Sequence, residues 1–115
     1  MAMGSFATVA LQHPANLSIV ILDNESYGET GGQLSHTASG VDLAGIARAC
    51  GVLDSFVVTK ERELEALAIR INAVSSGPTV AVVKIDSAEK PRFLPSRDGI
   101  LLKTRLRAAL GLEQM

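Results

Sequence analysis

One stretch decides how this chain is organised: Leu22-Asp23-Asn24-Glu25-Ser26-Tyr27-Gly28-Glu29-Thr30-Gly31-Gly32-Gln33. A run of apolar and β-branched residues, 17–22, comes directly before the loop and predicts a buried strand. This strand ends in Asp-Asn and leads into a polar segment rich in glycine. In open α/β sheets, ligands bind at the carboxyl ends of the strands, so we expect the chemistry of this chain at that edge.

The loop offers two kinds of group to a ligand. Asp23 and Asn24 carry side-chain oxygens of the kind that Mg²⁺ and Ca²⁺ accept. Three glycines further along leave backbone N–H groups open to an anion: Gly28, Gly31 and Gly32. An Asp-Asn pair after a strand is as often only a turn former, because both side chains hydrogen-bond their own backbone. The residues alone leave both alternatives open.

The order of these residues resembles the cofactor motif of thiamine-diphosphate-dependent enzymes. That motif opens with Gly-Asp-Gly and closes, after a helix and a strand, with a pair that is usually Asn-Asn. Here an expected helix containing Gly4-Ser5-Phe6-Ala7-Thr8-Val9-Ala10 and then the strand 17–22 precede Asp23-Asn24-Glu25-Ser26-Tyr27-Gly28. The later Thr-Gly-Gly-Gln (30–33) and Asp-Leu-Ala (42–44) are most similar to the phosphonopyruvate and sulfopyruvate decarboxylases. The resemblance runs from about Met3 to the C-terminus and is loose over 94–110.

The resemblance implies roles for four residues of the loop, with thiamine diphosphate and Mg²⁺ as cofactors. Asn24 would bind Mg²⁺ through its side-chain oxygen, and Ser26 would bind it through its backbone carbonyl. Tyr27 and Gly28 would lie against the diphosphate, through backbone N–H groups. Asp23 takes the place of the first Asn of the family's pair and is assigned no bond to the metal. No residue of this chain is assigned a catalytic role.

The first half of the motif has no counterpart here. No Asp precedes Asp23, and Gly4 is the one glycine before Gly28. The family's Gly-Asp-Gly supplies a carboxylate to Mg²⁺, and a site without it holds the cation weakly. We therefore expect this chain alone to be inactive as an enzyme.

Residues 23–40 form an expected loop of 18 residues, counted inclusively. Loops longer than about 12–15 residues in a compact domain are usually functional or disordered. The Gly-Gly-Gln likeness makes Gln33 a candidate for a polar contact with the substrate. His36 is a second candidate, although a solvated loop histidine is the more common case.

Composition narrows the class of protein. The chain has 115 residues, with 47% hydrophobic and 20% charged residues, as in one globular domain or a large part of one. A net charge of −1 gives no electrostatic basis for binding nucleic acid or an anionic membrane. Cys50 is the one cysteine, expected as a buried, inert thiol, and a chain without a disulfide suits a reducing cytoplasm. No export signal and no stretch long enough to cross a membrane is present.

Helical and strand patterns alternate along the chain, which predicts a three-layer α/β/α fold with a parallel sheet. With the resemblance, this is expected to be a partial thiamine-diphosphate-binding fold. Helices are expected over 1–11, 42–49, 61–75 and 100–110, and strands over 17–22, 56–59 and 79–85. The third helix should turn an apolar face inward: Leu64, Leu67, Ala68, Ile71 and Val74.

Two further expectations concern the strands. The first strand should be buried on both faces, and its unpaired apolar edge should invite pairing with another chain. Lys84, in the third strand, is expected to extend its charged end to solvent, with a role in a pocket as the alternative.

Two function hypotheses stay open for residues 1–115, expected to be a single partial domain in which 86–115 form a C-terminal arm and helix. In the first, the chain is part of a decarboxylase of a short 2-oxo acid and works as a homo-oligomer or with a partner subunit that supplies the pyrimidine-binding module. In the second, it is a non-catalytic assembly subunit or a truncated remnant that has lost cofactor binding. A generic nucleotide-binding module is disfavoured, because neither G-x-G-x-x-G nor G-x-x-x-x-G-K-[ST] occurs.

Overall fold

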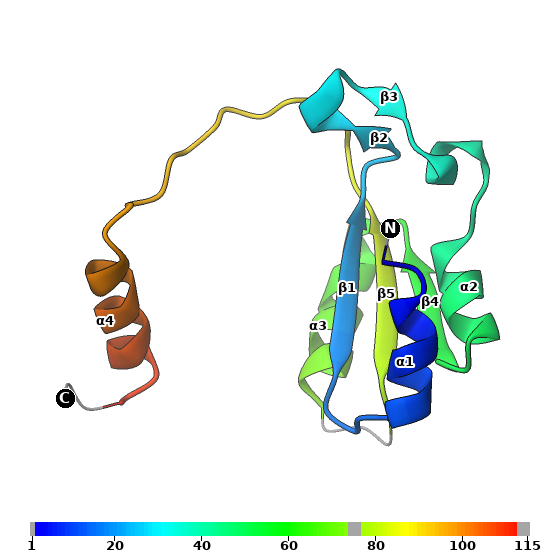
Figure 1. Ribbon diagram of the computed structural model, residues 1–115, viewed down its shortest axis with the longest axis horizontal. Helices are drawn as coiled ribbons and strands as arrows, with labels where there is room; N and C mark the ends of the chain where they lie inside the picture. Colours follow the sequence, from blue (N-terminus) through cyan, green and yellow to red (C-terminus); the bar gives the residue numbers. More distant parts are fainter. Residues whose placement is uncertain (1, 74–76, 113–115) are drawn as a thin grey trace.

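A parallel sheet forms the centre of the structure, a computed structural model that describes residues 2–73 and 77–112. Its strands are β1 (Ser18–Asp23), β4 (Asp54–Val58) and β5 (Thr79–Lys84), in the order β1-β5-β4 (Figure 1). β1 runs in register with β5, from Ser18 opposite Thr79 to Asp23 opposite Lys84. The strand that comes last in the sequence therefore lies in the middle of the sheet.

Helices cover the two faces of the sheet, and the expected three-layer α/β/α arrangement is confirmed. α1 (Ser5–Gln12) and α2 (Leu43–Ala49) lie on one face, and α3 (Leu64–Asn72) lies on the other (Figure 1). Successive side chains of a strand point to opposite faces of the sheet, so an apolar cluster forms on each face. The first joins Val80 of β5 to α1 and α2 through Phe6, Ala47 and Val52. The second joins Ala81 and Val83 of β5 to α3 and β4 through Leu67 and Val58.

Cys50 follows α2 and lies half-buried against the first of these clusters. The expectation of a buried thiol is therefore met only in part. Among the described residues, no helix combines the length and the hydropathy needed to cross a lipid bilayer.

The expectation that the first strand is buried on both faces is wrong. Ile19 and Ile21 of β1 pack against the first cluster, but Val20 and Leu22, on the opposite face, are exposed, Leu22 by 65%. The reason is that the second cluster, under α3, is built from β4 and β5. The expected unpaired edge is confirmed, because within the described residues β1 pairs only with β5.

The third helix differs from its expected form. It opens with a 3₁₀ turn, η3 (Glu61–Glu63), before the α-helical residues of α3. Leu67 is buried and Ile71 is half-buried, but Leu64 (42% exposed) and Ala68 face solvent. A sheet of three strands is narrow, so it covers only a thin stripe of the helix. Val74 lies outside the described residues.

The loop between β1 and α2 has regular structure that was not expected. β2 (Ser26–Tyr27) and β3 (Gln33–Leu34) form a small antiparallel pair, with the 3₁₀ turn η1 (Gly28–Thr30) between them. A second 3₁₀ turn, η2 (His36–Ser39), leads toward α2. The loop is therefore a folded hairpin that stands above the sheet (Figure 1).

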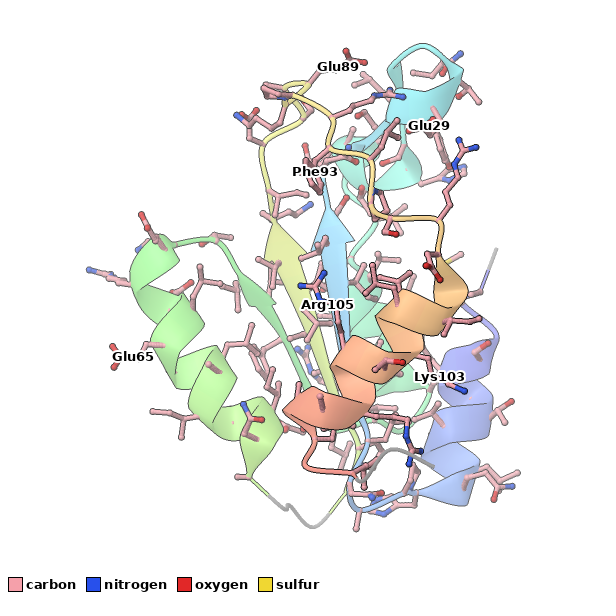
Figure 2. The ribbon with its side chains drawn as sticks, turned by 90° about the vertical axis from the view of Figure 1, so that its left-hand side faces the viewer. Glu29, Glu65, Glu89, Phe93, Lys103 and Arg105 are labelled. Carbon is pink, nitrogen blue, oxygen red and sulfur yellow. The ribbon has the colours of Figure 1, made fainter. Side chains whose placement is uncertain are left out.

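The C-terminal segment leaves the sheet altogether. Residues 86–98 form an exposed arm that carries α4 (Gly99–Ala109) away from the other elements (Figure 1). No residue of α4 is buried, and Lys103 and Arg105 project from opposite sides of it (Figure 2). One ion pair joins the arm to the hairpin, with Arg92 at 3.9 Å from Glu29, and both side chains are largely exposed. Such a pair contributes little stability.

Candidate functional site

Asp23, the last residue of β1, is the centre of a hydrogen-bond network at the carboxyl end of the sheet. It is only 8% exposed. Its Oδ1 accepts hydrogen bonds from the Glu25 N–H (2.9 Å) and the Thr37 hydroxyl (2.7 Å), and its Oδ2 accepts one from Lys84 Nζ (2.8 Å). Burial by itself would raise the pKa of this carboxyl, but the bonds from Lys84, Thr37 and Glu25 outweigh it and hold the pKa below its ordinary value.

Lys84 does not extend its charge to solvent as expected. Its Nζ lies 2.8 Å from Asp23 Oδ2 and 2.7 Å from Glu25 Oε1, so one ammonium group bridges two carboxylates. The hydrogen bonds to Asp23 and Glu25 raise the pKa of Lys84. The signal that could have revealed this contact is the register, because Lys84 ends β5 directly opposite the end of β1.

Asn24 and Ser26 form the turn that follows. The Ser26 N–H donates to Asn24 Oδ1 at 3.2 Å, which is the local turn that the sequence left open as an alternative. An amide oxygen has two lone pairs, so the same Oδ1 can still accept a cation. Between them, Glu25 has a φ of 58°, in the left-handed region. The turn and the ligand roles are therefore compatible.

Two adjoining cavities surround this turn, and both are lined by Asn24 and Ser26. The first, about 420 Å³, also brings in Tyr27 and His36, together with Asp23, Ser35 and Thr37 and an apolar wall of Met3, Leu22, Val41 and Leu43. The second, about 480 Å³, brings in Gly28, together with Glu25, Gly31, Gly32, Leu34, Ser87 and Glu89. The four residues assigned to the cofactor therefore lie around one region of the structure.

Gln33 lies apart from that group. Its Nε2 donates to the Thr30 carbonyl (2.7 Å) and its Oε1 accepts from the Thr30 hydroxyl (2.9 Å), and it lines neither cavity. These bonds close the turn between β2 and β3. Its observed contacts are therefore with the hairpin itself.

The glycines of the hairpin differ in backbone conformation and in their hydrogen bonds. Gly31 and Gly32 have φ values of 113° and 78°, a backbone conformation that other residues rarely adopt. The Gly32 N–H donates to the Tyr27 carbonyl at 2.9 Å, so it is not open to an anion as expected. Beside Gly28 there is open space, since a Cβ there would meet no atom within 4 Å. The space beside Gly28 therefore leaves room for a ligand to approach the backbone.

The metal-binding chemistry of the region is limited. Within residues 2–73 and 77–112, no three His, Cys, Asp or Glu side chains are placed to hold a metal ion together. The two carboxylates nearest to Asn24, those of Asp23 and Glu25, are both paired with Lys84. The oxygens of Asn24 and Ser26 are neutral, so a cation here would depend on negative charge from its ligand, from another chain or from Glu89, which lines the second cavity.

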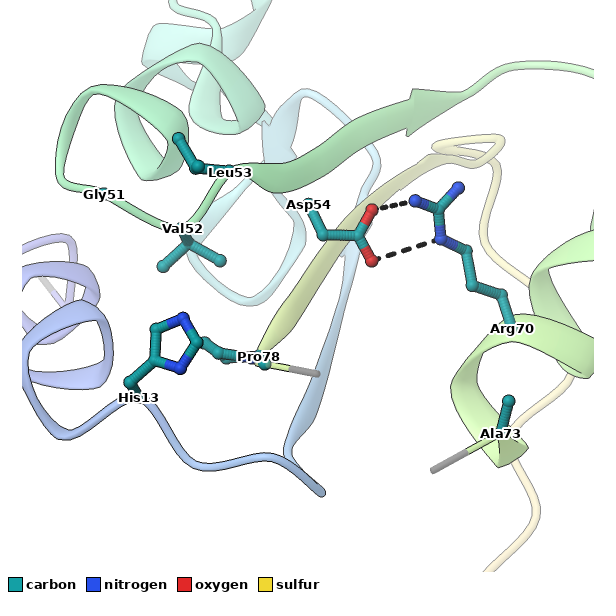
Figure 3. A pocket seen from close by; sticks show the side chains of 9 residues that line it. His13, Gly51, Val52, Leu53, Asp54, Arg70, Ala73 and Pro78 are labelled. Carbon is teal, nitrogen blue, oxygen red and sulfur yellow. Dashed lines mark hydrogen bonds and ion pairs between the residues drawn. The ribbon is translucent and has the colours of Figure 1, made fainter. Parts of the chain in front are cut away.

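A further cavity, about 560 Å³, lies at the opposite, amino end of β4 and β5 (Figure 3). Its charged groups pair with each other: Arg70 forms an ion pair with Asp54, and the Thr79 hydroxyl donates to Asp54 at 2.6 Å. The Arg70 guanidinium also lies 4.7 Å from the centre of the Phe56 ring. These contacts join α3 to the sheet, which is a structural role.

Most of the chain matches one known protein family. Residues 1–85 match the family described as "Thiamine pyrophosphate enzyme, C-terminal TPP binding domain". This segment ends one residue after β5 and contains both cavities' residues except Ser87 and Glu89. No solved structure matches the chain.

Three relatives show how much of a longer protein the chain covers. The sulfopyruvate decarboxylase subunit beta of Methanocaldococcus jannaschii is 40% identical over 65 residues, which are 56% of this chain and 34% of the relative. Its counterpart in Methanococcus maripaludis is 38% identical over 84 residues (73% and 44%). The phosphonopyruvate decarboxylase of Streptomyces viridochromogenes is 35% identical over 102 residues (84% and 25%). The chain thus spans less than half the length of each, and it belongs to the family of C-terminal thiamine-pyrophosphate-binding domains of thiamine pyrophosphate enzymes.

Proposed function

We propose that this chain supplies the diphosphate- and Mg²⁺-binding loop of a decarboxylase that acts on a short 2-oxo acid, of the sulfopyruvate or phosphonopyruvate type. One observation carries the proposal: Asn24, Ser26, Tyr27 and Gly28 surround adjoining cavities at the carboxyl end of a parallel sheet, within the segment that matches the family. The activities for which the relatives are named support the type of substrate.

The donors of the loop fit Mg²⁺ in kind. Mg²⁺ takes six oxygen ligands and commonly binds through few protein groups and the phosphates of its ligand. Asn24 Oδ1 and the Ser26 carbonyl would supply two neutral oxygens, and the diphosphate would bring the negative charge that they lack. The backbone at Tyr27 and Gly28 would lie against that diphosphate.

Bound thiamine diphosphate supplies the electron sink for loss of CO₂ from a 2-oxo acid. The part of this chain is to bind and to orient. The apolar wall of the first cavity, which includes Leu22, Val41 and Leu43, would exclude water beside the turn. His36 lines the same cavity and would contact the substrate, whereas Gln33 would do so only if its bonds to Thr30 opened.

The pyrimidine-binding module would come from a partner subunit or from a second copy of a longer chain. Two relatives are named as subunit beta of sulfopyruvate decarboxylase, which implies a second subunit in those enzymes. In this proposal residues 1–115 are one partial domain, with 86–115 as its C-terminal arm and helix. The unpaired edge of β1 offers backbone groups to which another chain can bind.

Calorimetric titration with thiamine diphosphate, with and without Mg²⁺, tests the proposal. We expect binding that requires Mg²⁺ and that Asn24→Ala abolishes, because the variant lacks the side-chain ligand. Ser26→Ala should leave binding intact, since the proposed ligand is a backbone oxygen. Asn72→Ala, the same change as at Asn24 but on exposed α3, is the matched control. Binding that survives Asn24→Ala would contradict the ligand assignment.

A second candidate function is a non-catalytic assembly subunit that keeps the fold without the cofactor. It is favoured by the pairing of Asp23 and Glu25, the residues on either side of Asn24, with Lys84, which leaves neither carboxylate free for a cation. The same titration separates the two candidates. No binding at millimolar ligand, alone or mixed with the partner subunit, would favour assembly.

A further inference from the structure

The backbone between the two proposed Mg²⁺ ligands is held in a disfavoured conformation. Glu25 lies between Asn24 and Ser26, and with His13 it is one of two described residues other than glycine that have a positive φ. The left-handed region is disfavoured roughly tenfold for a residue with a Cβ. Such a conformation persists only where the surrounding contacts hold it.

Lys84 and Asp23 together make those contacts. The Glu25 N–H donates to Asp23 Oδ1, and the Glu25 carboxylate accepts from Lys84 Nζ at 2.7 Å. Lys84 in turn binds the other oxygen of Asp23 at 2.8 Å. Both the backbone and the side chain of Glu25 are therefore tied to one buried carboxylate and one ammonium group.

The support behind Lys84 is the central strand of the sheet. β5 pairs with a strand on each side, and its first five residues are all buried. The Ile85 N–H donates to the Asp23 carbonyl at 3.1 Å, which extends the pairing of β1 and β5 beyond Lys84. The backbone at Lys84 is thus held in place by the core of the fold.

The residues that follow β3, Ser35 and Thr37, are hydrogen-bonded to Asp23 and Glu25 as well. The Thr37 hydroxyl has one proton and gives it to Asp23 Oδ1, so the Ser35 hydroxyl must be the donor in its 2.7 Å bond to Thr37. The Ser35 N–H donates to the Glu25 carbonyl at 2.9 Å. Residues on both sides of the hairpin therefore depend on the Asp23–Lys84 pair for their position.

We propose that Lys84 is a positioning residue of the cofactor loop: by bridging Asp23 and Glu25 it holds the left-handed turn that presents Asn24 and Ser26 to Mg²⁺. This inference rests on the proposed function of the loop. Lys84 acts through Glu25, so its removal lowers the affinity for Mg²⁺ without removing a ligand.

The test compares three variants of the 115-residue chain: Lys84→Met, Lys84→Arg, and Lys84→Met combined with Glu25→Gly. The first readout is hydrogen exchange of the Glu25 and Ser35 amides without ligand. The second is the Mg²⁺ concentration needed to bind thiamine diphosphate, measured by calorimetry. We expect Lys84→Met to raise both the exchange rates and the Mg²⁺ requirement about tenfold. Lys84→Arg, which keeps the charge, should stay close to the wild type.

The double variant separates positioning from general stability. Glycine adopts a positive φ at little cost, so Glu25→Gly should restore most of the Mg²⁺ affinity although the ion pairs are gone. The amides of Val80 and Val82 in β5 report on the fold as a whole and should keep their exchange rates. Unchanged Mg²⁺ affinity in Lys84→Met, or no recovery in the double variant, would overturn the inference.

Glu25→Gln covers the case in which Lys84→Met does not fold, because it leaves the Lys84–Asp23 pair intact. A smaller shift in the same direction, about threefold, is expected, and no shift would overturn the inference. The two proposals fail in different ways. If the wild-type chain binds no cofactor, alone or mixed with the partner subunit, the proposed function is overturned. If the wild type binds and Lys84→Met binds equally well, only the role of Lys84 is overturned.

Discussion

The sheet and the C-terminal segment use similar residues in opposite environments. Val80 and Ala81 of β5 are fully buried between two layers of helices, whereas Leu106 of α4 is 61% exposed and no residue of α4 is buried. The family match also ends at residue 85, where the arm begins. Apolar periodicity therefore predicts whether a segment forms a helix or a strand. It stabilises the fold only where the apolar side chains pack against another element. We expect the free energy of unfolding to reside in the sheet and its three helices.

The largest contrast should come from one substitution made in both regions. Leu67→Ala, in the second cluster, should lower the free energy of unfolding by about 2–5 kcal/mol, because it leaves a cavity. Leu106→Ala, the same change on exposed α4, should stay within about 0.5 kcal/mol. Urea denaturation followed by circular dichroism measures both. Equal losses would show that α4 packs against the sheet in solution.

Substituting one aspartate in the sheet and one in the arm compares the stability of the two regions again. Asp54 accepts from Arg70 and from the buried Thr79 hydroxyl, so Asp54→Ala should cost about 1–3 kcal/mol by leaving Thr79 without a partner. Asp86→Ala removes an exposed pair with Lys90 in the arm and should cost much less, because solvent screens the two charges. Thermal unfolding of the two variants beside the wild type gives the difference. A larger loss in Asp86→Ala would reverse the expected order.

The start of α4 tests whether the arm and the sheet unfold independently. The Asp98 carboxylate accepts from the Ile100 and Leu101 N–H groups, both at 3.0 Å. Asp98→Ala should weaken α4 by about 1 kcal/mol, because an isolated helix of this length depends on its cap. Hydrogen exchange should rise in α4 and stay unchanged in β5. Faster exchange in β5 would mean that the two regions are coupled.

The smallest effect concerns the start of α3 in acid. The Thr59 and Lys60 N–H groups both donate to Glu63 Oε2 at 3.0 Å, and these bonds hold the pKa of Glu63 below its ordinary value. A carboxyl whose pKa is lower in the folded state contributes stability above its ordinary pKa and loses it as the pH falls through the folded value. The free energy of unfolding should therefore decline less steeply below about pH 4.5 in Glu63→Gln than in the wild type. Identical slopes would contradict this role.

Local patterns predicted the elements of the fold but not their pairing. The β-branched run 79–85 predicts a strand, yet nothing within it says that this strand lies between the other two. That arrangement depends on contacts between residues far apart in the sequence. The same limit explains the wrong expectation for Lys84, whose partners Asp23 and Glu25 lie 61 and 59 residues away. The exposed face of β1 was missed because burial depends on where α3 lies.

The candidate site could be predicted as far as its residues lie close together in the sequence. Asn24, Ser26, Tyr27 and Gly28 form one short motif, and the fold keeps them together. The hairpin was missed because strands of two residues, such as β2, are too short to show a period. Thr37 reaches Asp23 only through that hairpin, so its contact had no signal in the sequence.

The middle position of β5 also governs when the protein can fold. β1 and β4 each pair with β5 and with no other described strand, so neither has a partner until residues 79–84 have been synthesised. Closing the chain between Asp23 and Lys84 must precede any gain from the pairing of β1, and contacts this distant in sequence slow folding. On the ribosome, these segments would therefore remain without their sheet until residues 79–84 had emerged, because both faces of the core depend on β5.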